Sequence, residues 1–333
     1  MNQEKLEKYE LQGSFHTLTV KTTGLIENGN KEFREVIKSN SNTDGETTTT
    51  INLNKINGDL FTFQEFQDTF EMLRNSMGLD HYRFLRADFR LDNYDGSHYQ
   101  DFAKLNKYLI SAMALTYEVK NCYKTDGLFS QNQLSIAIKN DYFQLENYDR
   151  NAKSKNTENH QEPAQARLEE RTMAKEFRRN YGDASGADGM EILKQEFTEK
   201  WLERWEKALE NLDAVGERYN EELERIYTEG KGAFPVRFRT LTDFLIQYQD
   251  CIFSQKQLIN LLERFPEVGN PKERAKSHKK RYGIEYISKK DARSAVDEIK
   301  RATLHYFEGQ KGDRKSTRLN SSHEIPSRMP SSA

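Results

Sequence analysis

The sequence predicts an α+β protein: an antiparallel sheet with helices on one face, then a long amphipathic helix and a small helical C-terminal domain. Three observations predict this class. Segments rich in Thr, or alternating between apolar and polar residues, are typical of strands. Runs with apolar residues three or four positions apart are typical of helices. Residues 134–140 and 143–150 are separated by only two residues, which favours a tight antiparallel hairpin.

The expected elements follow one another in a mixed order. Strands are expected at residues 13–22, 46–54, 81–92, 134–140, 143–150 and 166–174, and helices at residues 62–78 and 97–118. The helix at 62–78 carries Phe63, Phe66 and Phe70 at helical spacing and ends in Gly78. Because strands and helices are interspersed around a hairpin, we expect one sheet with helices packed on one face.

Three regions follow from breaks in this pattern. A Gly- and Asp-rich break at 180–189 ends the sheet domain, residues 1–180. Apolar side chains recur every three or four positions along residues 190–230, which predicts one long helix, or two hinged at Gly216, acting as a scaffold or a dimer contact. Residues 231–312 contain short helical segments and form the expected C-terminal domain.

The last 21 residues, 313–333, have almost no apolar content and no periodicity. They can be reverse-translated into a widely used synthetic sequencing adapter, read in frame from Asp313 to His323 and again from Ser327 to Ala333. We interpret this tail as translated adapter and not as native protein, and we expect no fold from it.

Composition narrows the class of protein. The chain has 333 residues, 31% of them charged, yet it contains 16 Tyr and 19 Phe, enough to build a core. The net charge of -2 means that any nucleic-acid site must be a local basic patch. Two distant cysteines, no apolar run of membrane-spanning length and no apolar signal region favour a soluble cytoplasmic protein with no membrane partner.

Three expected strands carry charges on one face. From Leu85 onward, the strand FLRADFRLD places Leu85, Ala87, Phe89 and Leu91 on one side and Arg86, Asp88, Arg90 and Asp92 on the other. The strand ARLEER places Arg167, Glu169 and Arg171 opposite Ala166 and Leu168, and the strand FQLENYDR places Glu146, Tyr148 and Arg150 opposite Phe143 and Leu145. If helices cover the apolar side, all three strands direct their charges to the open face. An ordinary wet face with cross-strand ion pairs remains the alternative.

The residue types on this face suit phosphodiester chemistry. The carboxylates Asp88, Glu146 and Glu169 are candidate ligands for Mg²⁺ or Mn²⁺, because hard cations prefer oxygen. The arginines suit phosphate, and the candidates are Arg86, Arg90, Arg150, Arg167 and Arg171. Tyr148 between them is the candidate nucleophile, and its hydroxyl needs a metal or a base to activate it. Tyr94, Tyr142 and Tyr181 remain alternatives.

The densest basic run lies in the C-terminal domain. The segment NPKERAKSHKKRYG, 270–283, supplies six candidate phosphate contacts: Lys272, Arg274, Lys276, Lys279, Lys280 and Arg281. Because the region is small and helical, we expect a DNA-binding module of helix-turn-helix type, with a solvated face as the alternative.

The order of RADFRLD, a helix, a hairpin ending in NYDRNAKS, and ARLEER resembles replication initiators of rolling-circle plasmids in Gram-positive bacteria. Arg86, Asp88 and Asp92 match the family's first element, Tyr148, Asp149 and Arg150 the second, and Arg167 and Glu169 the third. The resemblance covers roughly residues 80–175. The His-hydrophobe-His metal motif of many rolling-circle nickases is absent, so a carboxylate site would have to replace it.

The resemblance implies a sequence-specific DNA nickase. Its tyrosine joins the 5′ phosphate of origin DNA, single-stranded at the nick, and frees a 3′ hydroxyl for a host polymerase, with a host helicase as a further partner. It also implies a divalent metal and often a homodimer. Two other functions remain open: a non-enzymatic DNA-binding or copy-control protein of a mobile element, and an interaction scaffold built around residues 190–230.

Overall fold

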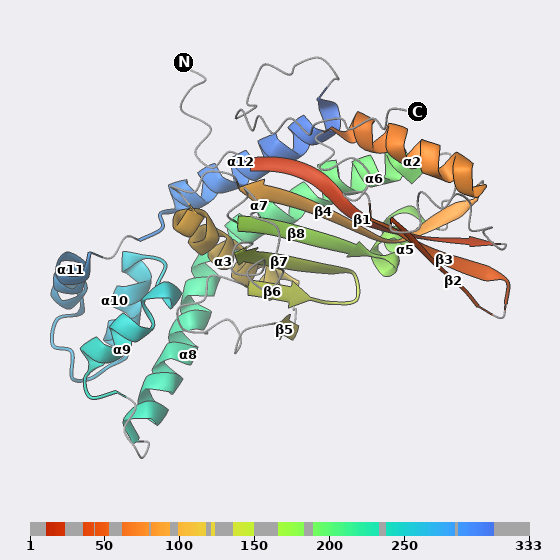
Figure 1. Cartoon of the computed structure of the whole chain (residues 1–333). Helices are drawn as coiled ribbons and strands as arrows, with labels where there is room; N and C mark the ends of the chain where they lie inside the picture. The colour runs from red at the N-terminus through yellow and green to blue at the C-terminus, as the bar shows by residue number, and fades with distance from the viewer. Residues whose placement is uncertain are drawn as a thin grey trace, which may run out of the picture.

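The computed structural model describes most of the sheet and the helices around it (Figure 1). The described residues are 11–23, 36–42, 44–52, 62–79, 81–93, 99–117, 121–123, 136–149, 166–182, 189–232, 238–283 and 286–309. The expectation for the tail, 313–333, and the candidates Tyr94 and Arg150 therefore lie outside the described residues.

Within the described residues, eight strands form one sheet in which every neighbouring pair is antiparallel. The strands are β1 (Leu11–Thr23), β2 (Ile37–Ser41), β3 (Glu46–Asn52), β4 (Tyr82–Asn93), β5 (Asn121–Tyr123), β6 (Ile136–Lys139), β7 (Phe143–Asp149) and β8 (Ala166–Met173). Their order across the sheet is β2-β3-β1-β4-β8-β7-β6-β5. All six expected strands are confirmed, and the two that were not expected, β2 and β5, are the edge strands.

The helices are interspersed with these strands and continue beyond them. They are α2 (Phe63–Met77), α3 (Tyr99–Thr116), α5 (Ala174–Tyr181), α6 (Gly189–Gln195), the π-helix η5 (Glu196–Trp201), α7 (Leu202–Glu210), α8 (Leu212–Gly232), α9 (Leu241–Gln247), the 3₁₀-helix η6 (Gln249–Cys251), α10 (Gln255–Glu263), α11 (Pro271–Tyr282) and α12 (Lys289–Glu308). Several of them line one side of the sheet (Figure 1). The predicted α+β class is confirmed.

The core lies between the sheet and these helices. Phe15 of β1 and Phe89 of β4 are completely buried, with ring centroids 5.4 Å apart. Both rings contact Phe197 of η5 and Phe307 of α12. Aromatic rings of this size dominate the burial of apolar surface, so the apolar alternation of the central strands determines which face the helices cover.

Two β-bulges adjust the alternation of the central strands. Between β1 and β4 the register shifts at His16, and again opposite Leu85. Leu85 was expected on the core side, but it is only half-buried, and Tyr82 and Phe84 are buried before it. Because a bulge inserts one extra residue, it reverses the side to which the following side chains point.

The expected long helix at 190–230 is broken twice, and not at Gly216. The first break is the wider helical turn of the π-helix at Glu196–Trp201. The second is a tighter turn at Asn211, between α7 and α8. Gly216 lies inside α8, where an added Cβ would meet Gln257 at an ordinary contact distance of 3.5 Å. Trp201, Trp205 and Tyr219 are buried within the same chain, so this segment is an internal scaffold for the core.

The region expected as one C-terminal domain, 231–312, divides in space. Helices α9, α10 and α11 lie together beside α8, away from the sheet, whereas α12 runs back along it (Figure 1). Tyr306 of α12 stacks edge-on against Phe15 with ring centroids 5.9 Å apart. The apolar face of α12 therefore completes the sheet domain's core, and its Ser288 capping box begins a new helix after α11.

Candidate active site

Four adjacent strands carry the predicted charged face. Three rows of facing residues run across β4, β8 and β7: Asp92, Arg167 and Tyr148; Arg90, Glu169 and Glu146; and Asp88, Arg171 and Gln144. On the far side of β4, β1 faces these rows with Gln12, Ser14 and Thr17. The antiparallel register thus brings together side chains from three segments of the sequence, as the alternation predicted.

The face is buried, whereas we expected it to be open. Asp88 and Glu169 are 1% and 4% exposed, and Arg90 and Arg167 are 2% and 4% exposed. Arg86 and Arg171 are more accessible, with side-chain exposures of 37% and 24%. Buried charges are tolerated where an opposite charge and hydrogen bonds replace water, and each of these side chains has such partners on its own or a neighbouring strand.

The first row is held by a two-pronged ion pair. Arg167 donates from Nε and Nη2 to the two carboxylate oxygens of Asp92, at 2.6 and 2.8 Å. Arg90 lies 3.3 Å from Asp92 through its Nε, which also donates to the Ser14 hydroxyl at 2.7 Å. Paired in this geometry, Asp92 orients both arginines along the sheet.

The three predicted metal ligands converge on one arginine. Arg171 donates to Glu169 at 3.0 and 3.1 Å, and lies 3.5 Å from Asp88 and 3.8 Å from Glu146. Within the part of the chain that the structure describes, no three His, Cys, Asp or Glu side chains are grouped closely enough to hold a metal ion. Asp88, Glu146 and Glu169 thus lie around one guanidinium cation and are not grouped closely enough to form the predicted metal site.

The predicted nucleophile Tyr148 is in hydrogen-bond contact with a carboxylate. Its hydroxyl donates to Glu169 Oε2 at 3.0 Å. Burial, and then the Glu169 carboxylate, raises the pKa of Tyr148 above its ordinary value of 10.0. Burial alone would raise the pKa of Glu169, but Arg171, His16 and Arg167 outweigh it and lower that pKa. The resting pair is therefore a neutral phenol bonded to a carboxylate.

At Asp88, unlike at Glu169, burial outweighs the neighbouring positive charges and raises the pKa. Burial raises its pKa to about 6, although the hydrogen bond from Arg86 opposes that rise. Arg86 donates to Asp88 Oδ1 at 2.6 Å from the more exposed end of the face. A carboxylate with a pKa near neutrality is sensitive to any added cation or phosphate nearby.

Alternation in the sequence did not reveal His16. The β1 bulge places its half-buried ring on the charged face, where Nδ1 lies 2.7 Å from the Thr17 hydroxyl. Burial, and then the Arg90 charge, lowers the pKa of His16 to about 4, so the ring is neutral near pH 7. A His within the Thr-rich strand SFHTLTV is the only signal, because nothing local marks the bulge.

The two alternative nucleophiles that the structure describes, Tyr142 and Tyr181, lie elsewhere. Tyr142 is exposed at the tip of the β6–β7 hairpin. Tyr181 ends α5, where burial and then Glu196 raise its pKa, and Glu196 belongs to a separate charged cluster. Of the described tyrosines considered as nucleophiles, Tyr148 alone contacts the charged face.

That second cluster lies on the helix-covered side of β8. Arg204 of α7 donates to Glu170 of β8, to Glu176 at 2.8 Å and to Glu196 at 2.9 Å. All four side chains are at most 4% exposed. Sequence reasoning missed this cluster, although Glu170 in ARLEER stands at an apolar position of the strand, which was a usable signal.

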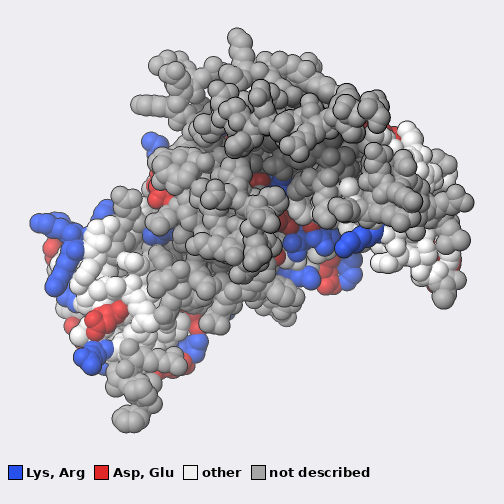
Figure 2. Space-filling model, viewed as in Figure 1, with Lys and Arg blue, Asp and Glu red and all other residues white. Residues whose placement is uncertain are grey.

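The basic run forms the exposed helix α11. Lys272, Arg274, Lys276, Lys279, Lys280 and Arg281 are all exposed, while Ala275 and His278 are buried. Asn270 caps the helix, Pro271 begins it and Gly283 ends it with φ 62°. Basic side chains gather where α11 lies (Figure 2). This helix is separate from the charged face (Figure 1).

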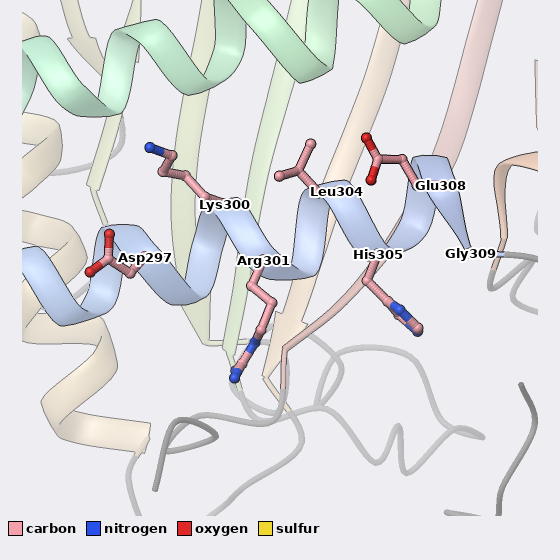
Figure 3. Close-up of a pocket in the computed structure, with 7 residues that line it drawn as sticks. All are labelled: Asp297, Lys300, Arg301, Leu304, His305, Glu308 and Gly309. Carbon is pink, nitrogen blue, oxygen red and sulfur yellow. The ribbon is translucent and has the colours of Figure 1, made fainter. Parts of the chain in front are cut away.

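A hollow of about 730 Å³ borders α12. Its described lining comes from one helix: Asp297, Lys300, Arg301, Leu304, His305, Glu308 and Gly309. Arg301 and His305 point to one side of the helix, and Lys300 and Leu304 to the other (Figure 3). None of the described residues that line the hollow belongs to the charged face.

No protein-family model, curated protein or solved structure matches this chain. Among the described helices, none is both long and apolar enough to cross a membrane.

Proposed function

We propose that this chain is a replication initiator of a plasmid or mobile element, which nicks and rejoins origin DNA through Tyr148 with a divalent metal. The observation that carries the proposal is the 3.0 Å hydrogen bond from the Tyr148 hydroxyl to Glu169. A nucleophile bonded to a base that a third group orients, here Arg171, is the general arrangement for nucleophilic catalysis.

The proposed reaction is a reversible phosphodiester transfer. Glu169 takes the proton of Tyr148 as the phenol oxygen attacks phosphorus. The bond from phosphorus to the 3′ oxygen breaks, the 3′ oxygen takes a proton from water and leaves as a hydroxyl, and the 5′ phosphate stays on the tyrosine. Attack by a 3′ hydroxyl on that linkage reverses these steps and rejoins the strand. Because the pKa of Tyr148 is raised and that of Glu169 lowered, proton transfer needs added positive charge at the site.

The arginines would supply part of that charge. A phosphate reaching Arg171 competes with the carboxylates that now surround it, and Arg86 is accessible enough to meet the strand first. Once Arg171 turns to phosphate, Asp88, Glu146 and Glu169 lose their shared cation. These carboxylate oxygens are the donor type that Mg²⁺ or Mn²⁺ prefers, and they would have to draw closer together than they now lie to hold the ion. A bound metal would stabilise the phenolate and the charge that develops on the phosphoryl group.

Covalent capture of DNA tests the proposal. The protein is mixed with labelled single-stranded DNA from the origin of the element that encodes it, with Mg²⁺ or Mn²⁺, and resolved on a denaturing gel. A protein–DNA adduct is expected from the unaltered chain and from Tyr142→Phe, a matched control on the same hairpin. Tyr148→Phe should abolish the adduct, and Glu169→Gln should slow its formation at least tenfold, as expected for a general base. Adduct formation that survives Tyr148→Phe, or none with either metal, contradicts the proposal.

A second candidate is a DNA-binding protein without nicking activity. The exposed helix α11, remote from the charged face, favours it. Salt-sensitive binding of origin DNA without any adduct would support this alternative.

A further inference from the structure

A further basic surface, apart from α11 and the charged face, lies at the end of the sheet where β8 is followed by α5. It consists of Arg83 on β4, Tyr142 at the β6–β7 tip, and Lys175, Arg178 and Arg179 on α5; we call it the α5 surface. Arg83 and Arg178 line the same small cleft. Lysine and arginine side chains gather where α5 and the end of β8 lie (Figures 1 and 2).

Tyr142 is unusual among the described aromatic residues because it is exposed and yet fixed. Its exposure is 36%, and only two other large hydrophobic residues that the structure describes, Met72 and Ile246, are also exposed. Asn140 accepts hydrogen bonds from the backbone N–H groups of Tyr142 and Phe143, both at 2.8 Å. The Tyr142 carbonyl accepts from Met173 N at 2.8 Å, which ties the tip to the end of β8.

A guanidinium supports the ring. Arg179 lies 4.5 Å from the Tyr142 ring centroid, within the range of a cation–π contact. Lys175, Arg178 and Arg179 are exposed. Among the described acidic groups beside the α5 surface, Asp141 pairs with Lys175, and the buried Glu176 pairs with Arg179 and also with Arg204. Glu46 lies 3.9 Å from Arg83 and also pairs with Lys21. Positive charge therefore prevails around an exposed aromatic ring.

The α5 surface is continuous with the charged face. Gln144, two residues after Tyr142, faces Arg171 across β7 and β8. Met173, which bonds to Tyr142, faces Arg86 across β8 and β4. A chain lying across Arg86 and Arg171 would meet Tyr142 next.

We propose that the α5 surface binds single-stranded DNA beside the cleavage site, with one base stacked on Tyr142 and the backbone held by Arg83, Lys175 and Arg178. This inference rests on the proposed function, since it names the path of the strand that Tyr148 cuts. Single-strand-binding surfaces combine stacking aromatics with basic grooves. Duplex DNA does not fit as well, because its bases are stacked inside the helix and offer no free face.

Binding without cleavage tests it. The full chain, without divalent metal, is titrated into fluorescently labelled oligo(dT) of roughly 12 nucleotides, and anisotropy gives Kd. Tyr142→Ala should weaken binding by roughly 5- to 150-fold, the range that loss of one base–aromatic stack produces. Tyr142→Phe keeps the ring and should stay within about twofold. Thermal unfolding of Tyr142→Ala should match the unaltered chain, since the side chain is exposed.

Photocrosslinking locates the contact. Oligo(dT) carrying one 5-iodouracil should crosslink to Tyr142, and the crosslink should disappear in Tyr142→Ala. Binding of Tyr142→Ala within twofold of the unaltered chain overturns the inference, and so does equal weakening for duplex DNA of the same length. Since no step requires nicking, Tyr142-dependent binding without any covalent adduct would leave this inference standing while the nicking function failed.

Discussion

Replacing Arg204 by Met should destabilise the protein strongly at pH 8. The guanidinium is 4% exposed and is bonded to three carboxylates, Glu170, Glu176 and Glu196, that are almost fully buried. Removing one partner of a buried ion pair leaves uncompensated charge, which costs about 3–5 kcal/mol. Met retains much of the packing of the aliphatic Arg204 stem, and it loses only the guanidinium, which lies 4.9 Å from the Phe143 ring centroid. The loss should therefore be mainly electrostatic.

The pKa values of these buried carboxylates determine how the loss of stability depends on pH. With Arg204 present, burial already raises the pKa of Glu170 to about 7 and that of Glu196 above its ordinary value. Removing the positive charge raises these folded-state pKa values further above the unfolded value near 4.5. Stability contributed by a raised pKa is present at low pH and lost as pH rises through the folded pKa. The deficit of Arg204→Met should therefore shrink as pH falls from 8 toward 5.

Urea unfolding at pH 8 and pH 5, followed by far-UV circular dichroism, measures both quantities. Arg225→Met is the matched control: Arg225 also bonds to two glutamates, but on the exposed surface of α8, and no measurable change is expected. A loss below about 1 kcal/mol for Arg204→Met at pH 8, or the same loss at both pH values, would refute the electrostatic account.

The raised pKa of Glu170 and the positive charge of α11 can each be tested by substitution. Glu170→Gln mimics the protonated carboxyl and does not titrate. The unfolding free energy of this variant minus that of the unaltered chain should therefore rise by up to about 3 kcal/mol between about pH 4.5 and pH 7 and then stay constant. A difference that does not change with pH would contradict the raised pKa of Glu170. Replacing the exposed Lys279 and Lys280 of α11 by Gln should leave thermal stability unchanged and lower the slope of log K against log salt for DNA binding by up to about 2; an unchanged slope would remove α11 from the interface.

The central strands were predictable because their alternation is strong. β4 carries apolar residues on one face and charges on the other, and β8 does so except at Glu170; this local pattern is sufficient to predict both strands and the side that the helices cover. The edge strands β2 and β5 were missed because they are 5 and 3 residues long and have a neighbour on one side only. Short edge strands are determined by the strand they pair with more than by their own sequence.

The sequence was sufficient to predict which residues share the charged face, but not that these residues are buried. Side chains at alternate positions of a strand share a face, so the sequence was sufficient to assign Asp88, Glu169 and Tyr148 to one side of the sheet. Whether that face is wet depends on pairings such as Arg167 with Asp92, which are 75 residues apart in sequence. His16 depends on a bulge, and Arg204 reaches β8 across 34 residues from another element. Sequence patterns that repeat over a few residues hold no information on such contacts.

The two charged clusters together explain why β8 carries a charged residue, Glu170, on its otherwise apolar face. Glu169 and Arg171 lie on the face that carries Tyr148. Glu170, between them in sequence, accepts a hydrogen bond from Arg204 on the opposite face. In the proposed reaction Glu169 accepts a proton at a defined distance, which needs a backbone that does not shift, since a displacement of about 1 Å can cost a hundredfold in rate. An ion cluster behind the strand fixes β8 by directional bonds, which an apolar contact there would not provide. We therefore interpret the Arg204 cluster as the support that holds Glu169 against Tyr148, at the cost of burying four charged side chains.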